Sequence, residues 1–256
     1  MATPIDISEQ AGIRYLHFGS AWIQGAMRIT TPDALELDYT REMMAGLLLR
    51  DGLNSDGGAW PRRVLIVGLG TASLVKFLHR HCPWARMEVV EIEPAVLTVA
   101  RQFFCLPAES ERLRVCLGDG VRHVLESREY YDYVLVDGYD RQARAGGLDT
   151  QPFHQAVRAR LSEEGLAVYN LLGGSKTCGA SMERILTAYD ARAFILPPCE
   201  GGNIVAFAAE GAPVSRPIAE LRTRAAILKA QTGLDLLPTL GRIEAAGSVP
   251  GATLLI

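Results

Sequence analysis

The sequence is poor in cysteine, in long apolar runs and in net charge. Its five cysteines are scattered and include no Cys-x-x-Cys pair, which argues against a disulfide framework or a zinc site and for reduced thiols. The longest apolar run, residues 43–49, is too short to cross a bilayer, and residues 1–10 lack the pattern of a signal peptide. A net charge of -3 supplies no basic field for a phosphate backbone. These absences predict a cytoplasmic protein without a membrane or nucleic-acid partner.

Apolar residues, by contrast, are plentiful: they make up 48% of the 256 positions and suffice for one large domain with a buried core. Short apolar runs alternate with longer amphipathic ones, a pattern that favours an α/β fold with a parallel sheet. The expected strands are Val64–Val67, Met87–Glu91, Leu113–Leu117, Tyr133–Asp137 and Leu166–Asn170. The expected helices are Ala72–His81, Pro94–Phe104, Val121–Glu126 and Pro152–Leu161.

The segment after this alternation predicts how the sheet closes. A helix near Ala180–Ala191 leads to two short apolar runs, Ala193–Leu196 and Ile204–Ala208, joined by a turn rich in proline and glycine. We expect these two runs to form an antiparallel hairpin at one sheet edge. A last helix is expected at Pro217–Gln231.

The N-terminal segment predicts a small β element, with strands at Ile13–Phe18 and Ala26–Ile29 and a covering amphipathic helix at Leu35–Leu49. Asp51–Trp60, rich in glycine, aspartate and asparagine, is expected to be a linker. The expected domains are residues 1–50 (β element and covering helix), 60–210 (main domain) and 211–256 (C-terminal helix and tail).

The turn after the first expected strand of the main domain predicts a nucleoside site. Gly68 and Gly70 allow a ligand to approach the backbone, and the following helix start offers free amides. The next strand ends about 20 residues later at Glu91, where a carboxylate can bind a ribose diol. Ser73 replaces the third glycine of the dinucleotide fingerprint, so an adenosine-type ligand fits better than NAD.

Two further strand ends carry acids. Asp119, which precedes Gly120, can accept a hydrogen bond from an adenine amino group or act as the N-cap of the next helix, and the two roles can coexist. Asp137 and Asp140 follow a buried strand and can hold a cationic substrate or take a proton from it. The alternative for this pair is a purely local role in the loop. The histidines have no spacing that would build a metal site, and none is expected.

A series of motifs follows one another between residues 13 and 172. They are Leu16-His-Phe-Gly19 with Gln24, Glu42-Met43-Met44, Gly68-Leu-Gly70, Glu91-Ile-Glu93, Asp119-Gly120, Tyr131-Asp132-Tyr133, Asp137-Gly-Tyr-Asp140, and Leu148 with Phe153. In this order they resemble the spermidine synthase (polyamine aminopropyltransferase) family, and within it the short bacterial spermidine synthase-like proteins. The resemblance implies a Rossmann-like sheet of the class I methyltransferase type.

The resemblance implies an activity and a set of roles. Members of the family transfer an aminopropyl group from decarboxylated S-adenosylmethionine to putrescine or a related amine, release methylthioadenosine and form homodimers. The implied roles are ribose binding by Glu91, adenine binding by Asp119 and Gly120, and catalysis by Asp137 as the proton acceptor and Asp140 as the anchor of the amine. Gly68 and Gly70 complete the expected nucleoside site, and Gln24 and Tyr139 are further candidates for amine binding. For Tyr139, a packing role is an equal alternative.

Several positions depart from the family pattern, including Arg141, which stands where the family has a proline after Asp140. Thr71 replaces an acid that is thought to repel the carboxylate of ordinary S-adenosylmethionine. Thr40 and Arg41 replace a tyrosine and a histidine, and an arginine near a diamine pocket repels the substrate unless it points away. The sequence therefore leaves two alternatives open: an S-adenosylmethionine-dependent methyltransferase, and a non-catalytic nucleoside-binding protein of the same fold.

Overall fold

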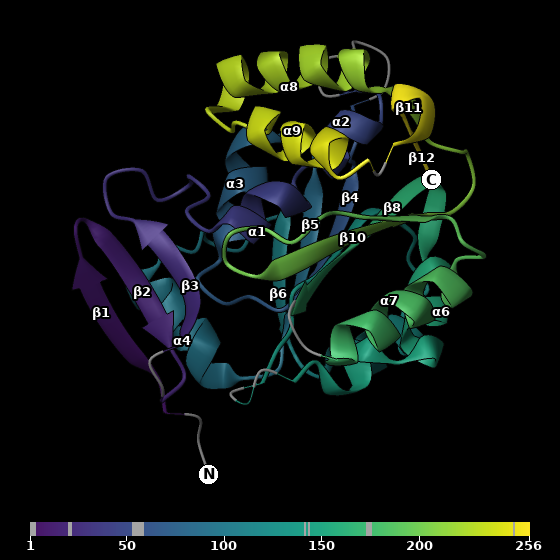
Figure 1. The fold of residues 1–256 in the computed structure, drawn as a ribbon. Helices are drawn as coiled ribbons and strands as arrows, with labels where there is room; N and C mark the ends of the chain where they lie inside the picture. Colours follow the sequence, from purple (N-terminus) through teal and green to yellow (C-terminus); the bar gives the residue numbers. More distant parts are fainter. Residues whose placement is uncertain are drawn as a thin grey trace.

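The computed structural model describes residues 4–19, 22–52, 59–140, 142, 144–172, 176–247 and 249–256. Its central sheet has the strand order β6-β5-β4-β7-β8-β10-β9. Figure 1 labels β4, β5, β6, β8 and β10 of this sheet. The strands are β4 (Arg63–Val67), β5 (Arg86–Glu91), β6 (Leu113–Leu117), β7 (Tyr131–Val136), β8 (Leu161–Leu172), β9 (Ala193–Ile195) and β10 (Asn203–Ala209). The β4, β5, β6, β7 and β8 pairings are parallel, whereas β10 runs antiparallel to both β8 and β9. This arrangement confirms the expected Rossmann-like sheet with a closing antiparallel hairpin.

Helices cover both faces of the sheet, because its central strands are apolar on both sides. In β4, Val64 and Ile66 belong to one core cluster, and Leu65 and Val67 belong to the cluster on the opposite face. The connecting helices are α3 (Ser73–His81), α4 (Pro94–Phe103), α5 (Gly120–Glu126), α6 (Gln151–Arg158) and α7 (Lys176–Ala188), with the short 3-10 helix η1 (Gly146–Asp149) before α6. Each lies within a few residues of an expected helix, apart from η1, which the pattern did not indicate.

The N-terminal β element is present as an antiparallel sheet of β1 (Asp6–Gln10), β2 (Ile13–His17) and β3 (Ile23–Arg28). The sequence pattern missed β1, because this strand is polar and mostly exposed. Most of the expected linker, residues 53–58, lies outside the described residues.

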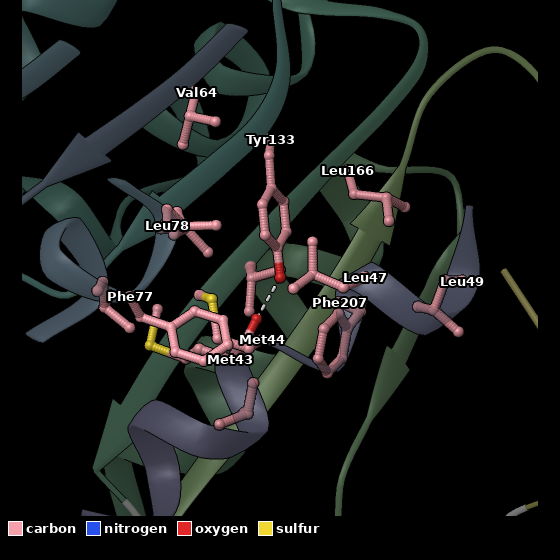
Figure 2. Packing of buried hydrophobic residues seen from close by; sticks show 14 of the residues in the cluster. Met43, Met44, Leu47, Leu49, Val64, Phe77, Leu78, Tyr133, Leu166 and Phe207 are labelled. Atoms are coloured by element: carbon pink, nitrogen blue, oxygen red, sulfur yellow. Dashed lines mark hydrogen bonds between the residues drawn. The ribbon is translucent and has the colours of Figure 1, made fainter. Parts of the chain in front are cut away.

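The expected single helix at Leu35–Leu49 is wrong: the chain forms two short helices, α1 (Asp38–Met43) and α2 (Gly46–Leu49). The Tyr133 hydroxyl donates a hydrogen bond to the Met43 carbonyl, which a continuous helix would have used itself (Figure 2). A Cβ on Gly46 would also lie 2.5 Å from the Tyr133 hydroxyl oxygen. The buried tyrosine therefore interrupts the helix.

The C-terminal residues pack onto the same core as the main domain. The expected helix at Pro217–Gln231 is confirmed as α8 (Ile218–Thr232), and α9 (Leu237–Ala245), β11 (Ser215–Pro217), the 3-10 helix η2 (Pro250–Ala252) and β12 (Thr253–Leu255) follow or flank it. Leu221, Leu240 and Ile243 share a cluster with the apolar residues of α2, and α8 and α9 lie over that helix in Figure 1. In the described part of the chain, no helix is long and apolar enough to span a membrane.

Candidate active site

The carboxyl ends of β4 and β7 meet at the point where the strand order reverses, which is where open α/β sheets bind ligands. The Asp137 amide donates to the Val67 carbonyl oxygen at 2.8 Å. Gly68 has φ +97°, and a Cβ there would lie 2.1 Å from the Asp137 carbonyl oxygen. Only glycine fits this close approach, so Gly68 brings the glycine turn and Asp137 together.

Glu91 holds the same turn from the end of β5. Its buried carboxylate accepts hydrogen bonds from the Leu69 amide and from the Glu93 amide, both at 2.8 Å. Burial raises the pKa of Glu91, and the backbone donors oppose that rise. The structure thus places Glu91 beside Gly68 and Gly70 as the sequence indicates, and adds a structural task that sequence reasoning missed.

Asp119 and Gly120 lie at the end of β6, next along the same sheet edge. One oxygen of the exposed Asp119 carboxylate accepts from the Val121 and Arg122 amides, at 2.7 and 3.1 Å. This is the N-cap geometry of α5. A Cβ on Gly120 would lie 2.4 Å from a methyl carbon of Val67, so a side chain there would disturb β4.

Two apolar side chains are exposed beside these acids. Ile92, which follows Glu91, is 68% exposed, and Leu117, two residues before Asp119, is 53% exposed. Glu91 and Leu117 are direct partners in the pairing of β5 with β6. An apolar surface flanked by two carboxylates suits a flat heterocycle that carries hydrogen-bonding groups at its edge.

Asp137 is half-buried and receives hydrogen bonds from two neutral side chains. The Tyr39 hydroxyl donates to one carboxylate oxygen at 3.3 Å, and the Asn170 side-chain amide donates to the other at 2.8 Å. Burial raises the pKa of Asp137, while both donors favour the ionised form. A carboxylate in such surroundings is a stronger base than an exposed one.

Asp137 lies on the wall of a cavity of about 340 Å³, counted with the space open to solvent. The cavity lies between the N-terminal element and the glycine turn, with Gln24 from β3, Tyr39 from α1 and Thr71 from the turn on its wall. The Thr71 hydroxyl shares a 2.9 Å hydrogen bond with the Ser73 hydroxyl, so this part of the wall is polar and uncharged.

Two expected amine contacts are engaged elsewhere. Asp140 accepts from the Gln142 and Arg144 amides and pairs with the Arg144 guanidinium at 2.8 Å, and these donors lower its pKa although partial burial opposes them. The Tyr139 hydroxyl donates to the Asn170 carbonyl at 2.7 Å and accepts from the Leu172 amide at 3.1 Å. Neither residue is among those that line the cavity.

Arg41 is not among the residues that line the cavity. Its guanidinium donates to the carbonyls of Leu35 and Glu36 and to the carboxylate of Asp38. The Asp38 carboxylate therefore offsets the positive charge that would otherwise repel a cationic amine.

Sequence reasoning missed two residues that contact Asp137. Tyr39 directly precedes Thr40, one position before the place where the family carries its tyrosine. Asn170 ends an expected strand, and a polar residue at the carboxyl edge of a parallel sheet is the signal that could have found it.

The fold and the site define a Rossmann-like protein of the methyltransferase type. The model of the spermine/spermidine synthase domain matches residues 39–174, and the chain belongs to this family. A polyamine aminopropyltransferase of Neisseria meningitidis serogroup A is 33% identical over 242 residues, covering 94% of this chain and 89% of the relative.

Solved structures show the same fold. A probable spermidine synthase from Corynebacterium glutamicum superposes with a TM-score of 0.67 at 17% identity, covering 80% of this chain and 76% of that one. Human methyltransferase-like protein 13, in complex with SAH, gives a TM-score of 0.63 at 26% identity over 77% of this chain and 93% of that one. The fold is thus shared by aminopropyl- and methyltransferases.

Proposed function

We propose that this chain is a polyamine aminopropyltransferase of the spermidine synthase type. A nitrogen of a putrescine-like di- or polyamine attacks the propyl carbon beside the sulfonium of decarboxylated S-adenosylmethionine. A carbon–nitrogen bond forms, the carbon–sulfur bond breaks with its electron pair passing to sulfur, and methylthioadenosine leaves. The observation that carries the proposal is the half-buried Asp137 on the cavity wall beside the glycine turn.

Asp137 is the base in this proposal. The attacking amine must lose a proton, and a carboxylate whose pKa is raised by burial accepts it more readily than an exposed one. The ionised form also stabilises the positive charge of the sulfonium and of the amine as they meet. Holding the two reactants in line in the cavity supplies part of the rate acceleration.

The nucleoside occupies the edge formed by β4, β5 and β6. Glu91 binds the ribose hydroxyls with the lone pairs that remain after its contacts with backbone amides. The second oxygen of Asp119 accepts from the adenine amino group, and the exposed Ile92 packs against the base. Gly68, Gly70 and Gly120 leave room for the sugar and the base.

The amine lies between the cavity and the loop after β7. Gln24 contacts it from the cavity wall. Asp140 anchors its outer end by exchanging Arg144 for the substrate ammonium; the two side chains are 40% and 69% exposed, and such exposed pairs are weak. Tyr139 supports the site through its contacts with β8.

The setting we propose is a cytoplasmic homodimer that acts without a metal ion. Membership of the spermidine synthase family supports the assembly, and the scattered cysteines support the compartment. Among the described residues, no group of three or more metal-ligating side chains could hold an ion.

Methyl transfer from S-adenosylmethionine is the second candidate, and Thr71 favours it. This residue gives the cavity a neutral wall where other family members place an acid, and the 26% identical methyltransferase structure holds SAH. The half-buried Asp137 favours the first candidate, because a cationic amine needs a base and a counter-charge.

Calorimetry separates the candidates by comparing decarboxylated with ordinary S-adenosylmethionine, using methylthioadenosine as the reference. A preference of tenfold or more for the decarboxylated form, about 1.4 kcal/mol, would support aminopropyl transfer. Equal or tighter binding of the ordinary form would favour methyl transfer. Binding of none of the three would favour a non-catalytic protein.

A further inference from the structure

The hydrogen bond from Asn170 to Asp137 is one link of a longer chain. Asn170 donates through its side-chain nitrogen to Asp137 at 2.8 Å, and its side-chain oxygen accepts from the Asn203 side-chain nitrogen at 2.9 Å. Asn170 lies on β8 and is buried, whereas Asn203 begins β10 and is half-buried. The antiparallel pairing of these strands, which sets Asn203 opposite Leu172 and Val205 opposite Asn170, brings the two amides together.

The charge on Asp137 determines which group donates and which group accepts in each of these hydrogen bonds. An ionised carboxylate can only accept hydrogen bonds, so Asn170 must present its nitrogen to Asp137. Its oxygen then faces Asn203, which must donate. Without a donor on residue 203, neither of these hydrogen bonds would keep the nitrogen of the Asn170 amide turned towards Asp137. The amide oxygen of Asn170 could then face Asp137, which would disfavour the ionised carboxylate.

We propose that Asn203 and Asn170 are positioning residues, which keep the Asp137 carboxylate ionised and aimed into the cavity through the chain Asn203–Asn170–Asp137. This inference rests on the proposed role of Asp137 as the base. Asn203 acts through Asn170, and it is held by its own backbone, whose carbonyl accepts from the Cys199 amide at 2.9 Å.

Apart from the Tyr39 hydroxyl, which also donates to Asp137, the titratable groups around this carboxylate leave its stabilisation to the two amides. Tyr39 faces Asp137 from α1, and Tyr139 lies near Asp137 on the same segment after β7. Cys199, from the segment between β9 and β10, lies near Tyr39. Burial raises the pKa of both tyrosines and of the Cys199 thiol, so all three are neutral near pH 7. Tyr139 also fixes the backbone of β8 at Asn170 and Leu172.

The test compares Asn203→Leu with Asn170→Leu, using Glu200→Gln on the same segment as an exposed control. Both leucine variants remove hydrogen bonding without adding a charge. The readout is the pKa of Asp137, followed through carboxyl ¹³C chemical shifts and assigned with Asp137→Asn. We expect this pKa to rise in the order wild type, Asn203→Leu, Asn170→Leu, and to stay unchanged in Glu200→Gln.

Turnover gives the second readout. For Asn203→Leu, kcat/KM should fall about tenfold near pH 7 and recover at higher pH, with methylthioadenosine affinity within twofold of wild type. Asn203→Gln, which still can donate, should restore the profile. A pKa of Asp137 that is the same in Asn203→Leu and wild type would overturn the inference, as would a loss of turnover equal at every pH. Should Asn203→Leu not fold, Asn203→Ala makes the same comparison.

The two readouts also separate this inference from the proposed function. A shift in the pKa of Asp137 without any aminopropyl transfer would support the hydrogen-bond chain and refute the proposed reaction. Aminopropyl transfer by the wild type, with no shift in the pKa of Asp137 in the variants, would support the proposed reaction and refute the hydrogen-bond chain.

Discussion

At the scale of single residues, Asp137 is subject to opposing influences. Burial raises its pKa, while hydrogen bonds from Tyr39 and Asn170 favour the charged form. Both donors are uncharged, so they orient the carboxylate without neutralising it as a cation would. The group can therefore attract an ammonium and then accept a proton from it.

Replacing Asp137 with asparagine tests this role. We expect Asp137→Asn to lower kcat about a thousandfold, within the range of lost general-base catalysis, and to leave methylthioadenosine binding within a few-fold. Rates and calorimetric affinities measured on the same preparation check both parts. Undiminished turnover would remove Asp137 from the chemistry.

The pH dependence of turnover follows from the direction of the Asp137 pKa. The base acts when ionised, so kcat/KM should be lost as the pH falls through a value above the ordinary aspartate range. Tyr39→Phe removes one hydrogen-bond donor to the ionised carboxylate, so the acid limb of the pH–rate profile should move to still higher pH. A pH–rate profile with an unmoved or lower acid limb in Tyr39→Phe would contradict the account.

Glu91 supports the glycine turn and has a proposed role in binding the nucleoside. We expect Glu91→Gln to weaken methylthioadenosine binding by ~1–3 kcal/mol, the usual cost of lost charged hydrogen bonds, because an amide would also turn a donor towards the Leu69 or Glu93 amide. Calorimetry measures the affinity of Glu91→Gln for methylthioadenosine, with Glu111→Gln, at an exposed position, as the control. Equal affinities in the two variants would refute the ribose role.

At the scale of elements, Asp119 has a structural and a proposed binding role that two substitutions can separate. Asparagine caps helices about as well as aspartate, so Asp119→Asn should keep the free energy of unfolding while it weakens adenosine binding. Asp119→Ala should lose binding and also about 1 kcal/mol of stability through α5. If Asp119→Asn bound methylthioadenosine as tightly as wild type, the N-cap would be the whole function of Asp119.

Most elements of the main domain were predictable because their signals are local. Runs such as Val64–Val67 are apolar on both faces, Pro94 begins a helix, and Asp119 and Thr150 provide caps next to the helices they start. The break between α1 and α2 was not predictable, because it depends on Tyr133, which is 90 residues away from Met43 in sequence.

The candidate site was likewise predictable where its features are local and not where they depend on residues far apart in the sequence. The glycine turn and the acids at strand ends follow from a parallel sheet, which brings successive carboxyl ends to one edge. The contact of Tyr39 with Asp137 spans 98 residues, and the Asn170 contact depends on how β7 and β8 are paired. The Asp140–Arg144 pair is local, but the free energies of competing exposed partners are too similar to predict which one forms.

At the scale of the whole molecule, the C-terminal helices are joined to the site region through Glu42. This residue of α1 is 1% exposed and pairs with Arg242 of α9, and burial raises its pKa although Arg242 opposes the rise. The Thr239 hydroxyl donates to the same oxygen at 3.4 Å. The last 46 residues, 211–256, thus support the helix that carries Tyr39.

Removing this partner should destabilise the whole fold. We expect Arg242→Met to lower the free energy of unfolding by ~3 kcal/mol, because it leaves a buried carboxylate unpaired. The loss should be smaller at pH 5 than at pH 8. The pKa of Glu42 in the folded protein is raised, so a protonated Glu42 needs no cationic partner below that pKa, and the variant loses stability as the pH rises through it. Chemical denaturation at both pH values measures this.

Arg222→Met is the matched control for that prediction. Arg222 and Glu244 form an ion pair between α8 and α9 in which the side chains are 45% and 38% exposed, so its loss should cost at most about 1 kcal/mol at either pH. Equal losses in Arg222→Met and Arg242→Met would show that the burial of Glu42 is unimportant.

The central claim is that this cavity transfers an aminopropyl group with Asp137 as the base. The most direct test is to incubate wild type and Asp137→Asn with decarboxylated S-adenosylmethionine and putrescine and to identify the products by mass spectrometry. We predict methylthioadenosine and the aminopropylated amine in equal amounts from the wild type, and about a thousandth of these amounts from Asp137→Asn in the same time. Absence of both products from the wild type, with a methylated amine formed from ordinary S-adenosylmethionine instead, would contradict the account.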